Sequence, residues 1–284
     1  MQIDLTGKVA IVTGAARGIG AEICRTLIDE GVTTVALDVS DDALAPLAAE
    51  IGGAPGGARA SGARLHPYAC DIRDSRRVTE VVENVRRSIG RIDILVNNAG
   101  VVSDAPIDEL PEAAWDFVHD VNLKGTFLMC QAVIPAMKRQ GWGRIINAAS
   151  YAAITPRIGS VAYATSKAAV VHFTRGLAGE LGPWGITVNA YAPGMVPTAI
   201  NHFTERPGAE QDALLNTLTL RRWGSAGDVS RLVCFLASEL AGYITGTLID
   251  VSGGKLATQF PQEAYQLADV PPVPSDSDPQ NHSR

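Results

Sequence analysis

Tyr163 and Lys167 stand four residues apart in a segment with helical character, so their side chains lie on one face of the predicted helix. A free tyrosine has a pKa of about 10 and is a poor base at neutral pH. A neighbouring ammonium group stabilises the phenolate and lowers that pKa toward the range of a working general acid or base. The pair alone also occurs by chance on surface helices, so its meaning depends on the residues around it.

Ser150 lies two residues after the end of the run Arg144–Ala148, which has the pattern of a strand. In sheets built from alternating strands and helices, ligands bind at the carboxyl ends of the strands. The Ser150 hydroxyl is therefore expected at a ligand site, where it could hydrogen-bond a substrate oxygen whose charge changes during a reaction. A hydroxyl at this place complements the Tyr163 and Lys167 pair.

A glycine-rich turn, TGAARGIG at residues 13–20, follows the strand-like run Val9–Thr13 and opens a helix. Gly14 permits a tight turn, Gly18 lets the backbone approach a pyrophosphate, and Gly20 allows close packing of the helix. The first N–H groups of the helix then point toward the anion. A tight turn without a ligand is the alternative, since three glycines alone are weak support.

Asp38 ends the second strand-like run and could accept hydrogen bonds from both hydroxyls of an adenosine ribose, while repelling a 2′-phosphate. This position favours NAD over NADP. Arg17, inside the glycine turn, is the opposing feature, because a guanidinium group there could hold a 2′-phosphate. Asp71, after the third run, could accept from the adenine amino group or simply cap a turn.

Strand-like and helical segments alternate along the chain, which predicts parallel strands with right-handed crossovers. The strands are apolar throughout, as a sheet covered on both faces requires. The predicted fold is therefore an α/β, doubly wound (Rossmann) parallel sheet with helices on both faces, in a single domain. The expected strands are 9–13, 33–37, 63–69, 92–96, 144–148 and 187–191, and the expected helices are 21–30, 41–51, 76–89, 113–139 and about 160–181.

Two segments differ from this pattern. Residues 52–62 have the composition of a flexible surface loop. Residues 260–284 form a proline-rich C-terminal tail that cannot build a core of its own, so residues 1–259 are expected to hold the binding and catalytic domain. The tail is expected to be either disordered or an arm that lies over a neighbouring subunit.

The composition limits the classes of function. Lys and Arg total 24 against 30 Asp and Glu, for a net charge of −6, and the basic residues are scattered, so no nucleic-acid partner is expected. No apolar run reaches the roughly 18 residues of a membrane span, and the first residues lack a secretion signal, which predicts a cytoplasmic protein without a membrane partner. Its four cysteines have no paired spacing, so no zinc or other metal site is expected.

Taken together, these residues resemble the short-chain dehydrogenase/reductase family, from about Leu5 to Gly254. Few families have so dense a signature. The shared pieces are TGAARGIG at 13–20, NNAG at 97–100, Asn122, Ser150, YATSK at 163–167 and PG at 193–194.

The resemblance implies that Tyr163 is the general acid/base and that Ser150 hydrogen-bonds the substrate oxygen. Lys167 would both tune Tyr163 and hold the nicotinamide ribose, and Asn122 would anchor a water molecule in a proton relay. Beside the glycine turn, Asp38 and Asp71, the residues expected to contact the cofactor are Ile19, Ile72, Asn98, Ala99, Gly100, Pro193, Gly194, Val196 and Thr198, the last of these near the nicotinamide carboxamide.

The expected function is the NAD-dependent interconversion of a secondary alcohol and a ketone. The chain resembles both 3-oxoacyl-carrier-protein reductases and sugar or polyol dehydrogenases. Asp38 favours the sugar or polyol, because carbohydrate oxidation commonly uses NAD and fatty-acid reduction commonly uses NADPH. The alternatives are a 3-oxoacyl-thioester reductase using NADPH or NADH, a nucleotide-binding regulator without turnover, and a lyase or epimerase that recycles bound NAD.

Specificity in the family resides mainly in a segment expected here as a helical lid, at about residues 195–223. His202, Phe203 and Arg206 are its candidate pocket residues, and Arg157 is a candidate contact for an anion. The two long helices expected at 113–139 and 160–181 carry apolar residues that one subunit does not cover. Relatives pair these helices, which predicts a symmetric homo-oligomer, a tetramer rather than a dimer.

Overall fold

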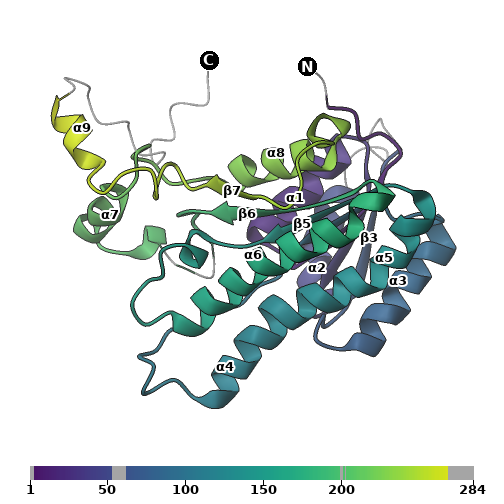
Figure 1. Cartoon of the computed structure of the whole chain (residues 1–284), viewed down its shortest axis with the longest axis horizontal. Coiled ribbons are helices and arrows are strands. Elements are labelled where there is room, and N and C mark those ends of the chain that lie inside the picture. Colours follow the sequence, from purple (N-terminus) through teal and green to yellow (C-terminus); the bar gives the residue numbers. More distant parts are fainter. Residues whose placement is uncertain (1–2, 53–61, 199–200, 202, 268–284) are drawn as a thin grey trace.

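A seven-stranded parallel sheet runs through the centre of the molecule, in the order β3-β2-β1-β4-β5-β6-β7 (Figure 1). The structure is a computed structural model that describes residues 3–52, 62–198, 201 and 203–267. Most of the 52–62 loop, residues 199, 200 and His202, and the tail beyond Leu267 therefore lie outside the described residues. The strands are Val9–Thr13 (β1), Thr33–Asp38 (β2), Leu65–Ala69 (β3), Ile94–Asn97 (β4), Gly143–Ala148 (β5), Ile186–Pro193 (β6) and Leu248–Val251 (β7).

Helices cover both faces of this sheet, as Figure 1 shows. One apolar core lies between the sheet and α1, α2 and α8, and a second lies between the sheet and α3, α5 and α6. The α/β, doubly wound fold in one domain is confirmed. The helices are Gly18–Asp29 (α1), Asp41–Gly52 (α2), Ser75–Ile89 (α3), Glu112–His119 (α4), Thr126–Gln140 (α5), Val161–Leu181 (α6), Gly208–Leu215 (α7), Ala226–Ala237 (α8) and Gln262–Leu267 (α9).

The central strands are apolar because both of their faces are covered. All residues of β1, β4 and β5 are buried. With no solvent-facing side, these strands show the continuous apolar runs that predicted them, rather than an alternation of apolar and polar residues. Because all the strand pairs are parallel, the carboxyl ends of the strands meet at one edge of the sheet.

One expected helix is divided in the structure. The segment expected as a single helix at 113–139 contains a π-helical stretch, Asp120–Gly125, between α4 and α5. Such wide turns frequently occur at functional sites, and this one contains Asn122. The sequence analysis also missed β7 and α8, which complete the sheet and its cover after Tyr191.

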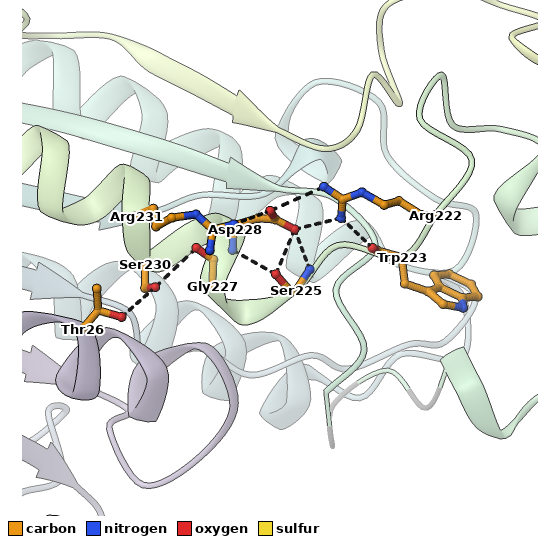
Figure 2. A network of polar contacts seen from close by, with 8 residues as sticks. All are labelled: Thr26, Arg222, Trp223, Ser225, Gly227, Asp228, Ser230 and Arg231. Carbon is orange, nitrogen blue, oxygen red and sulfur yellow. Dashed lines mark hydrogen bonds and ion pairs between the residues drawn. The ribbon is translucent and has the colours of Figure 1, made fainter. Parts of the chain in front are cut away.

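A polar network holds the start of α8 in place (Figure 2). Ser225 and Asp228 form a capping box, in which each side chain accepts from the other's backbone N–H. Arg222 donates to the Asp228 carboxylate at 3.0 Å, and Thr26 of α1 donates to Ser230 of α8 at 2.9 Å. The chain that enters α8 from residues 195–223 is therefore fixed to the core at this point.

The first part of the C-terminal tail contacts the same region. Tyr265, in α9, donates its hydroxyl proton to the Thr219 carbonyl at 2.7 Å and accepts from the Arg221 N–H at 3.1 Å. The described start of the tail thus lies against its own subunit, beside the segment expected as a lid.

Candidate active site

A cavity of about 660 Å³ opens at the carboxyl ends of the strands. It extends from the end of β2, through the glycine turn, to the ends of β5 and β6. Apart from Asn122, every residue that the sequence analysis proposed for catalysis or cofactor binding lines this cavity: Gly14, Arg17, Gly18, Ile19, Gly20, Asp38, Asp71, Ile72, Asn98, Ala99, Gly100, Ser150, Tyr163, Lys167, Pro193, Gly194, Val196 and Thr198.

The glycine turn leaves no room for side chains at two of its positions. A Cβ atom on Gly14 would lie 2.8 Å from the Ala99 Cα, and one on Gly20 would lie 2.0 Å from the Gly14 carbonyl oxygen. Arg17 precedes α1 without a side-chain cap, so the first N–H groups of the helix face the cavity. This close-packed turn with free N–H groups fits the pyrophosphate of a dinucleotide.

Asp38 is held at the far end of the cavity from Ser150. Its carboxylate accepts from the Ala16 N–H at 2.9 Å and from the Val39 N–H at 2.8 Å. These bonds fix a negative charge beside the glycine turn, where a ribose hydroxyl can donate to it. Arg17 is exposed on the wall of the same cavity.

Asp71 has a partner that the sequence did not indicate. Arg73 donates to its carboxylate at 2.6 Å, and this hydrogen bonding lowers the pKa of Asp71 below its usual value. The Arg73 guanidinium group also lies 5.1 Å from the centre of the Phe117 ring. An adenine amino group would therefore compete with Arg73 for Asp71.

Tyr163 and Lys167 lie on the cavity face of α6, as the four-residue spacing predicts. The Lys167 Nζ atom lies 5.8 Å from the centre of the Tyr163 ring and donates to the Ala148 carbonyl, at the end of β5, at 2.7 Å. Lys167 is 3% exposed, and burial lowers its pKa to about 8. Its ammonium group is thus held at the base of the cavity and can release its proton near neutral pH.

The pKa of Tyr163 differs from the sequence-based expectation in direction. Burial raises it above its ordinary value, and a hydrogen bond from Ser150 opposes that rise. The expectation that Lys167 lowers this pKa considered the charge of the lysine and not the desolvation of the phenol. In the protein alone, burial has the larger effect, so Tyr163 is a neutral hydroxyl at pH 7.

Ser150 begins a short 3-10 helix, Tyr151–Ala153, and its hydroxyl oxygen accepts from the Ala152 N–H at 3.1 Å. A hydroxyl group has a single proton to donate, and since Ser150 accepts from Ala152, that proton can bind the Tyr163 oxygen or a substrate oxygen. Ser150 and Tyr163 are therefore neighbouring hydroxyls that can bind the same substrate oxygen.

Asn122 lies behind the cavity wall and is 1% exposed. Its amide oxygen accepts from the Val101 N–H at 2.8 Å, and its amide nitrogen donates to the Val101 carbonyl at 3.0 Å and to the Ser166 hydroxyl at 2.9 Å. This side chain joins the loop after β4 to α6. Both amide hydrogens are thus bonded to protein atoms, and the Asn122 backbone carbonyl accepts from the Thr126 hydroxyl at 2.9 Å, so a water molecule could bind only at the remaining lone pair of the amide or carbonyl oxygen.

The loop after β4 is packed by residues that sequence reasoning missed. The Tyr191 hydroxyl donates to the Asn98 amide oxygen at 3.1 Å, and the Thr13 hydroxyl accepts from the Asn98 and Ala99 N–H groups at 3.1 and 3.0 Å. A Cβ on Gly100 would lie 3.2 Å from the Lys167 Nζ atom. A buried tyrosine in an apolar strand gives no local signal of such a role.

The segment that was expected as a lid, about residues 195–223, contributes two of its three candidate residues to the cavity. Phe203 stacks on Trp223 with ring centres 5.6 Å apart, and Arg206 lies 5.9 Å from the Phe203 ring centre. His202 lies outside the described residues. Arg157 also lines the cavity, where it forms an ion pair with Asp104, a residue that the sequence analysis did not select.

The described part of the chain lacks two kinds of feature. It contains no group of three or more His, Cys, Asp or Glu side chains placed to bind a metal ion. None of its helices is both long enough and apolar enough to cross a membrane.

Comparisons with known proteins agree with this geometry. The family model for short chain dehydrogenase matches residues 8–207. A 3-oxoacyl-(acyl-carrier-protein) reductase, FabG, of Thermotoga maritima is 40% identical over 251 residues, 88% of this chain and 98% of that protein. A D-threitol dehydrogenase of Mycolicibacterium smegmatis is 40% identical over 250 residues, 88% of this chain and 93% of that protein.

A solved structure is also similar. The crystal structure of a protein described as a short-chain alcohol dehydrogenase, from Sinorhizobium meliloti, superimposes with a TM-score of 0.84 at 35% identity, over 90% of this chain and 99% of the other. The family match, these relatives and the dinucleotide cavity have one explanation: the chain belongs to the short-chain dehydrogenase family and is an oxidoreductase that uses a nicotinamide cofactor.

Proposed function

We propose that the protein interconverts a secondary alcohol and a ketone with NAD as the cofactor, and that its substrate is a sugar or polyol. The observation that carries this proposal is the meeting of Ser150, Tyr163 and Lys167 at one end of a cavity whose other end contains Asp38. Strands β1 and β4 separate the end of β2 from the end of β5, so a dinucleotide can lie across the cavity and bridge a ribose site and a reaction site.

The nicotinamide ring, when bound, accepts or donates the hydride. In the oxidative direction, Tyr163 as phenolate takes the hydroxyl proton of the alcohol, and in the reductive direction its phenol returns that proton. Ser150 donates a hydrogen bond to the same substrate oxygen, which stabilises the charge that develops there. Both groups are positioned by the rigid end of β5 and the start of α6.

Lys167 has two roles in this proposal. Its ammonium group, 5.8 Å from the Tyr163 ring centre, favours the phenolate form whenever that form is needed. Because its pKa is about 8, Lys167 can also pass a proton on near neutral pH. Asn122 supports this path, and we propose that one of its oxygen atoms holds the water molecule of the relay.

The preference for NAD rests on Asp38. A carboxylate held by the Ala16 and Val39 N–H groups accepts from ribose hydroxyls and repels a 2′-phosphate. Arg17 on the same wall favours the phosphate of NADP. The charge of Asp38 is fixed in position by two hydrogen bonds, so we assign the larger effect to it.

A second candidate function is the reduction of a 3-oxoacyl thioester. The observation that favours it is the 40% identity to a relative named as a 3-oxoacyl-(acyl-carrier-protein) reductase, equal to the identity to the D-threitol dehydrogenase. A regulator that binds the nucleotide without turnover is a third candidate. The complete set of reactive side chains in the cavity supports an enzyme over a regulator.

One screen separates these candidates. Purified protein is assayed at 340 nm with polyols, sugars, hydroxy acids and 3-hydroxyacyl thioesters, each with NAD and NADP in parallel. The proposal expects reduction of NAD with a polyol or sugar as the best substrate. Turnover confined to thioesters with NADP would select the second candidate, and tight NADH binding without any turnover would select the third.

We also propose that residues 195–223 act as a lid on the domain formed by residues 1–259, and that the protein is a homotetramer. Phe117 of α4, Phe127 of α5 and Val161 of α6 are 42%, 42% and 39% exposed, and these three helices lie beside one another in Figure 1. Apolar side chains of this size in one region favour a subunit contact. Light scattering that shows only a 29.9 kDa species would contradict the tetramer. A cytoplasmic location stays a prediction.

A further inference from the structure

Two loops meet beside the reaction site and are tied together by charged side chains. Asp104, in the loop after β4, forms an ion pair with Arg157, in the loop between Ser150 and α6. The Ala105 N–H donates to the Gly159 carbonyl at 2.8 Å, which joins the same two loops through their backbones. Both charged side chains line the cavity that contains Tyr163.

Stability does not account for this ion pair. The side chains of Arg157 and Asp104 are 53% and 41% exposed, and an ion pair in such surroundings contributes about 0–1 kcal/mol. The backbone hydrogen bond between the loops remains without it. Among the ion pairs of the described residues, this pair and Asp71–Arg73 both line the cavity, and the charge of Asp104 acts on Tyr163, which places the Asp104–Arg157 pair at the reaction end.

The pair offers complementary hydrogen-bonding groups. A carboxylate only accepts hydrogen bonds and a guanidinium group only donates them, whereas an alcohol hydroxyl can do both at once. Tyr151 adds a hydroxyl to the same wall, and burial raises its pKa, so that it stays protonated. Arg157 and Asp104 shift this pKa in opposite directions, which shows that both charges lie near Tyr151.

The zero net charge of the pair also favours neutral substrates over charged ones. An anionic substrate that binds Arg157 would be repelled by the Asp104 carboxylate beside it. A neutral hydroxyl group can accept a hydrogen bond from Arg157 and donate one to Asp104 while the ion pair stays intact. The wall next to the reacting carbinol therefore suits a neutral, hydroxylated neighbour.

We propose that Asp104 and Arg157 form a specificity site that binds a second hydroxyl of the substrate, next to the carbinol that reacts at Tyr163. This inference rests on the proposed alcohol dehydrogenase function and narrows its substrate class to neutral polyols and sugars. In this proposal, Asp104 and Arg157 bind the substrate and take no part in proton transfer.

The experiment compares two alcohols of equal carbon number, D-threitol and 2-butanol, in the wild type, Asp104→Asn and Arg157→Gln, with NAD saturating. The readout is the ratio of kcat/KM for threitol to kcat/KM for 2-butanol. Asp104 contributes to the raised pKa of Tyr163, but this effect acts on both alcohols and cancels in the ratio. We expect either substitution to lower the ratio about 10-fold to 100-fold, mainly through the KM for threitol, because a hydrogen bond to a charged group is lost.

Two further variants distinguish binding of the substrate by this pair from a structural role in joining the two loops. The charge-swapped variant Asp104→Arg with Arg157→Asp can restore an ion pair between the loops but exchanges the positions of donor and acceptor. We expect its ratio to stay low, whereas recovery to the wild-type ratio would show a structural role and overturn the proposal. Glu109→Gln, the same change of carboxylate to amide on this loop but outside the cavity lining, is the matched control and should keep the wild-type ratio.

The remaining outcomes are also decisive. If the single variants lose kcat/KM equally for both alcohols, the specificity site is overturned and the proposed alcohol dehydrogenase function is unaffected. Wild-type turnover of 2-hydroxybutanoate that exceeds threitol turnover and is abolished by Arg157→Gln would identify an anion site instead. If the wild type oxidises neither alcohol but reduces 3-oxoacyl thioesters, the proposed function fails, and this inference fails with it.

Discussion

The ammonium group of Lys167 lies 5.8 Å from the centre of the Tyr163 ring and is bonded to the Ala148 carbonyl at the end of β5. The lysine thus joins the strand that carries Ser150 to the helix that carries Tyr163. This contact sets the distance between the two hydroxyl groups that we place on the substrate oxygen. It also buries a charge, which has consequences for stability.

Replacing Lys167 with Met should reduce kcat/KM by about 100-fold or more, since Tyr163 loses the cation that stabilises its phenolate. The free energy of unfolding should instead increase in this variant, because a buried charge is removed. The pKa of Lys167 is about 8 in the folded protein against an ordinary value of 10.5, so between these pH values the unfolded chain binds a proton that the folded chain has released.

The unfolding free energy of the wild type relative to Lys167→Met should therefore rise with pH across this interval, by up to about 1.4 kcal/mol per pH unit. Below pH 8 the buried lysine of the wild type is charged, so the free energy of unfolding of the wild type includes the full cost of burying that charge, whereas Lys167→Met does not. Urea unfolding at several pH values and one protein concentration measures this. A difference between the two proteins that does not change with pH would contradict a buried lysine with a lowered pKa.

Replacing Asp38 with Ser should lower kcat/KM for NAD about 10-fold to 100-fold, because a charged acceptor for the ribose hydroxyls is lost. The same change should raise kcat/KM for NADP, because the repulsion of the 2′-phosphate is removed. Steady-state kinetics with each cofactor measures both effects.

Arg17→Ala supplies the control for this cofactor switch. Added to Asp38→Ser, it should remove the gain with NADP and leave the rate with NAD little changed, since Arg17 is exposed beside the phosphate position. If Asp38→Ser lowers kcat/KM for NAD without raising kcat/KM for NADP, then Asp38 acts by holding the glycine turn through Ala16 and not by selecting the cofactor.

Replacing Tyr265 with Phe removes its hydrogen bonds to the Thr219 carbonyl and the Arg221 N–H. Each bond of this kind contributes about 0.5–1.5 kcal/mol, so the lid segment should be held less firmly and KM for the alcohol should rise several-fold. Faster proteolysis within residues 203–223 should accompany it. Tyr243→Phe is the matched control, because Tyr243 is fully exposed; equal behaviour of the two variants would leave α9 without a role in holding the lid.

The fold could be predicted because its cause is local in the sequence. Strands buried on both faces must be apolar throughout, and a phosphate-binding turn must contain glycine where a Cβ would collide with the backbone, as at Gly20. Both features appear as residue types at fixed spacings. The same holds for Tyr163 and Lys167, whose shared helix face follows from the helical repeat.

The rest of the site depends on contacts between segments far apart in the chain. Nothing near Asp104 in the sequence indicates Arg157, and nothing near Asn98 indicates that the Tyr191 hydroxyl donates to it. The π-helical turn at Asn122 is a local irregularity inside a regular helical pattern. The raised pKa of Tyr163 follows from desolvation, which is a property of the packed protein and not of the residues beside it.

The central claim is that the Tyr163 hydroxyl exchanges a proton with the substrate, and Tyr163→Phe tests it most directly. The change removes one oxygen atom from a residue on the cavity wall and leaves the dinucleotide contacts of the glycine turn in place. With the best alcohol found in the screen, we predict that kcat falls by about 100-fold to 10,000-fold while NADH still binds, as measured by its fluorescence. Turnover near the wild-type rate in this variant would contradict the account.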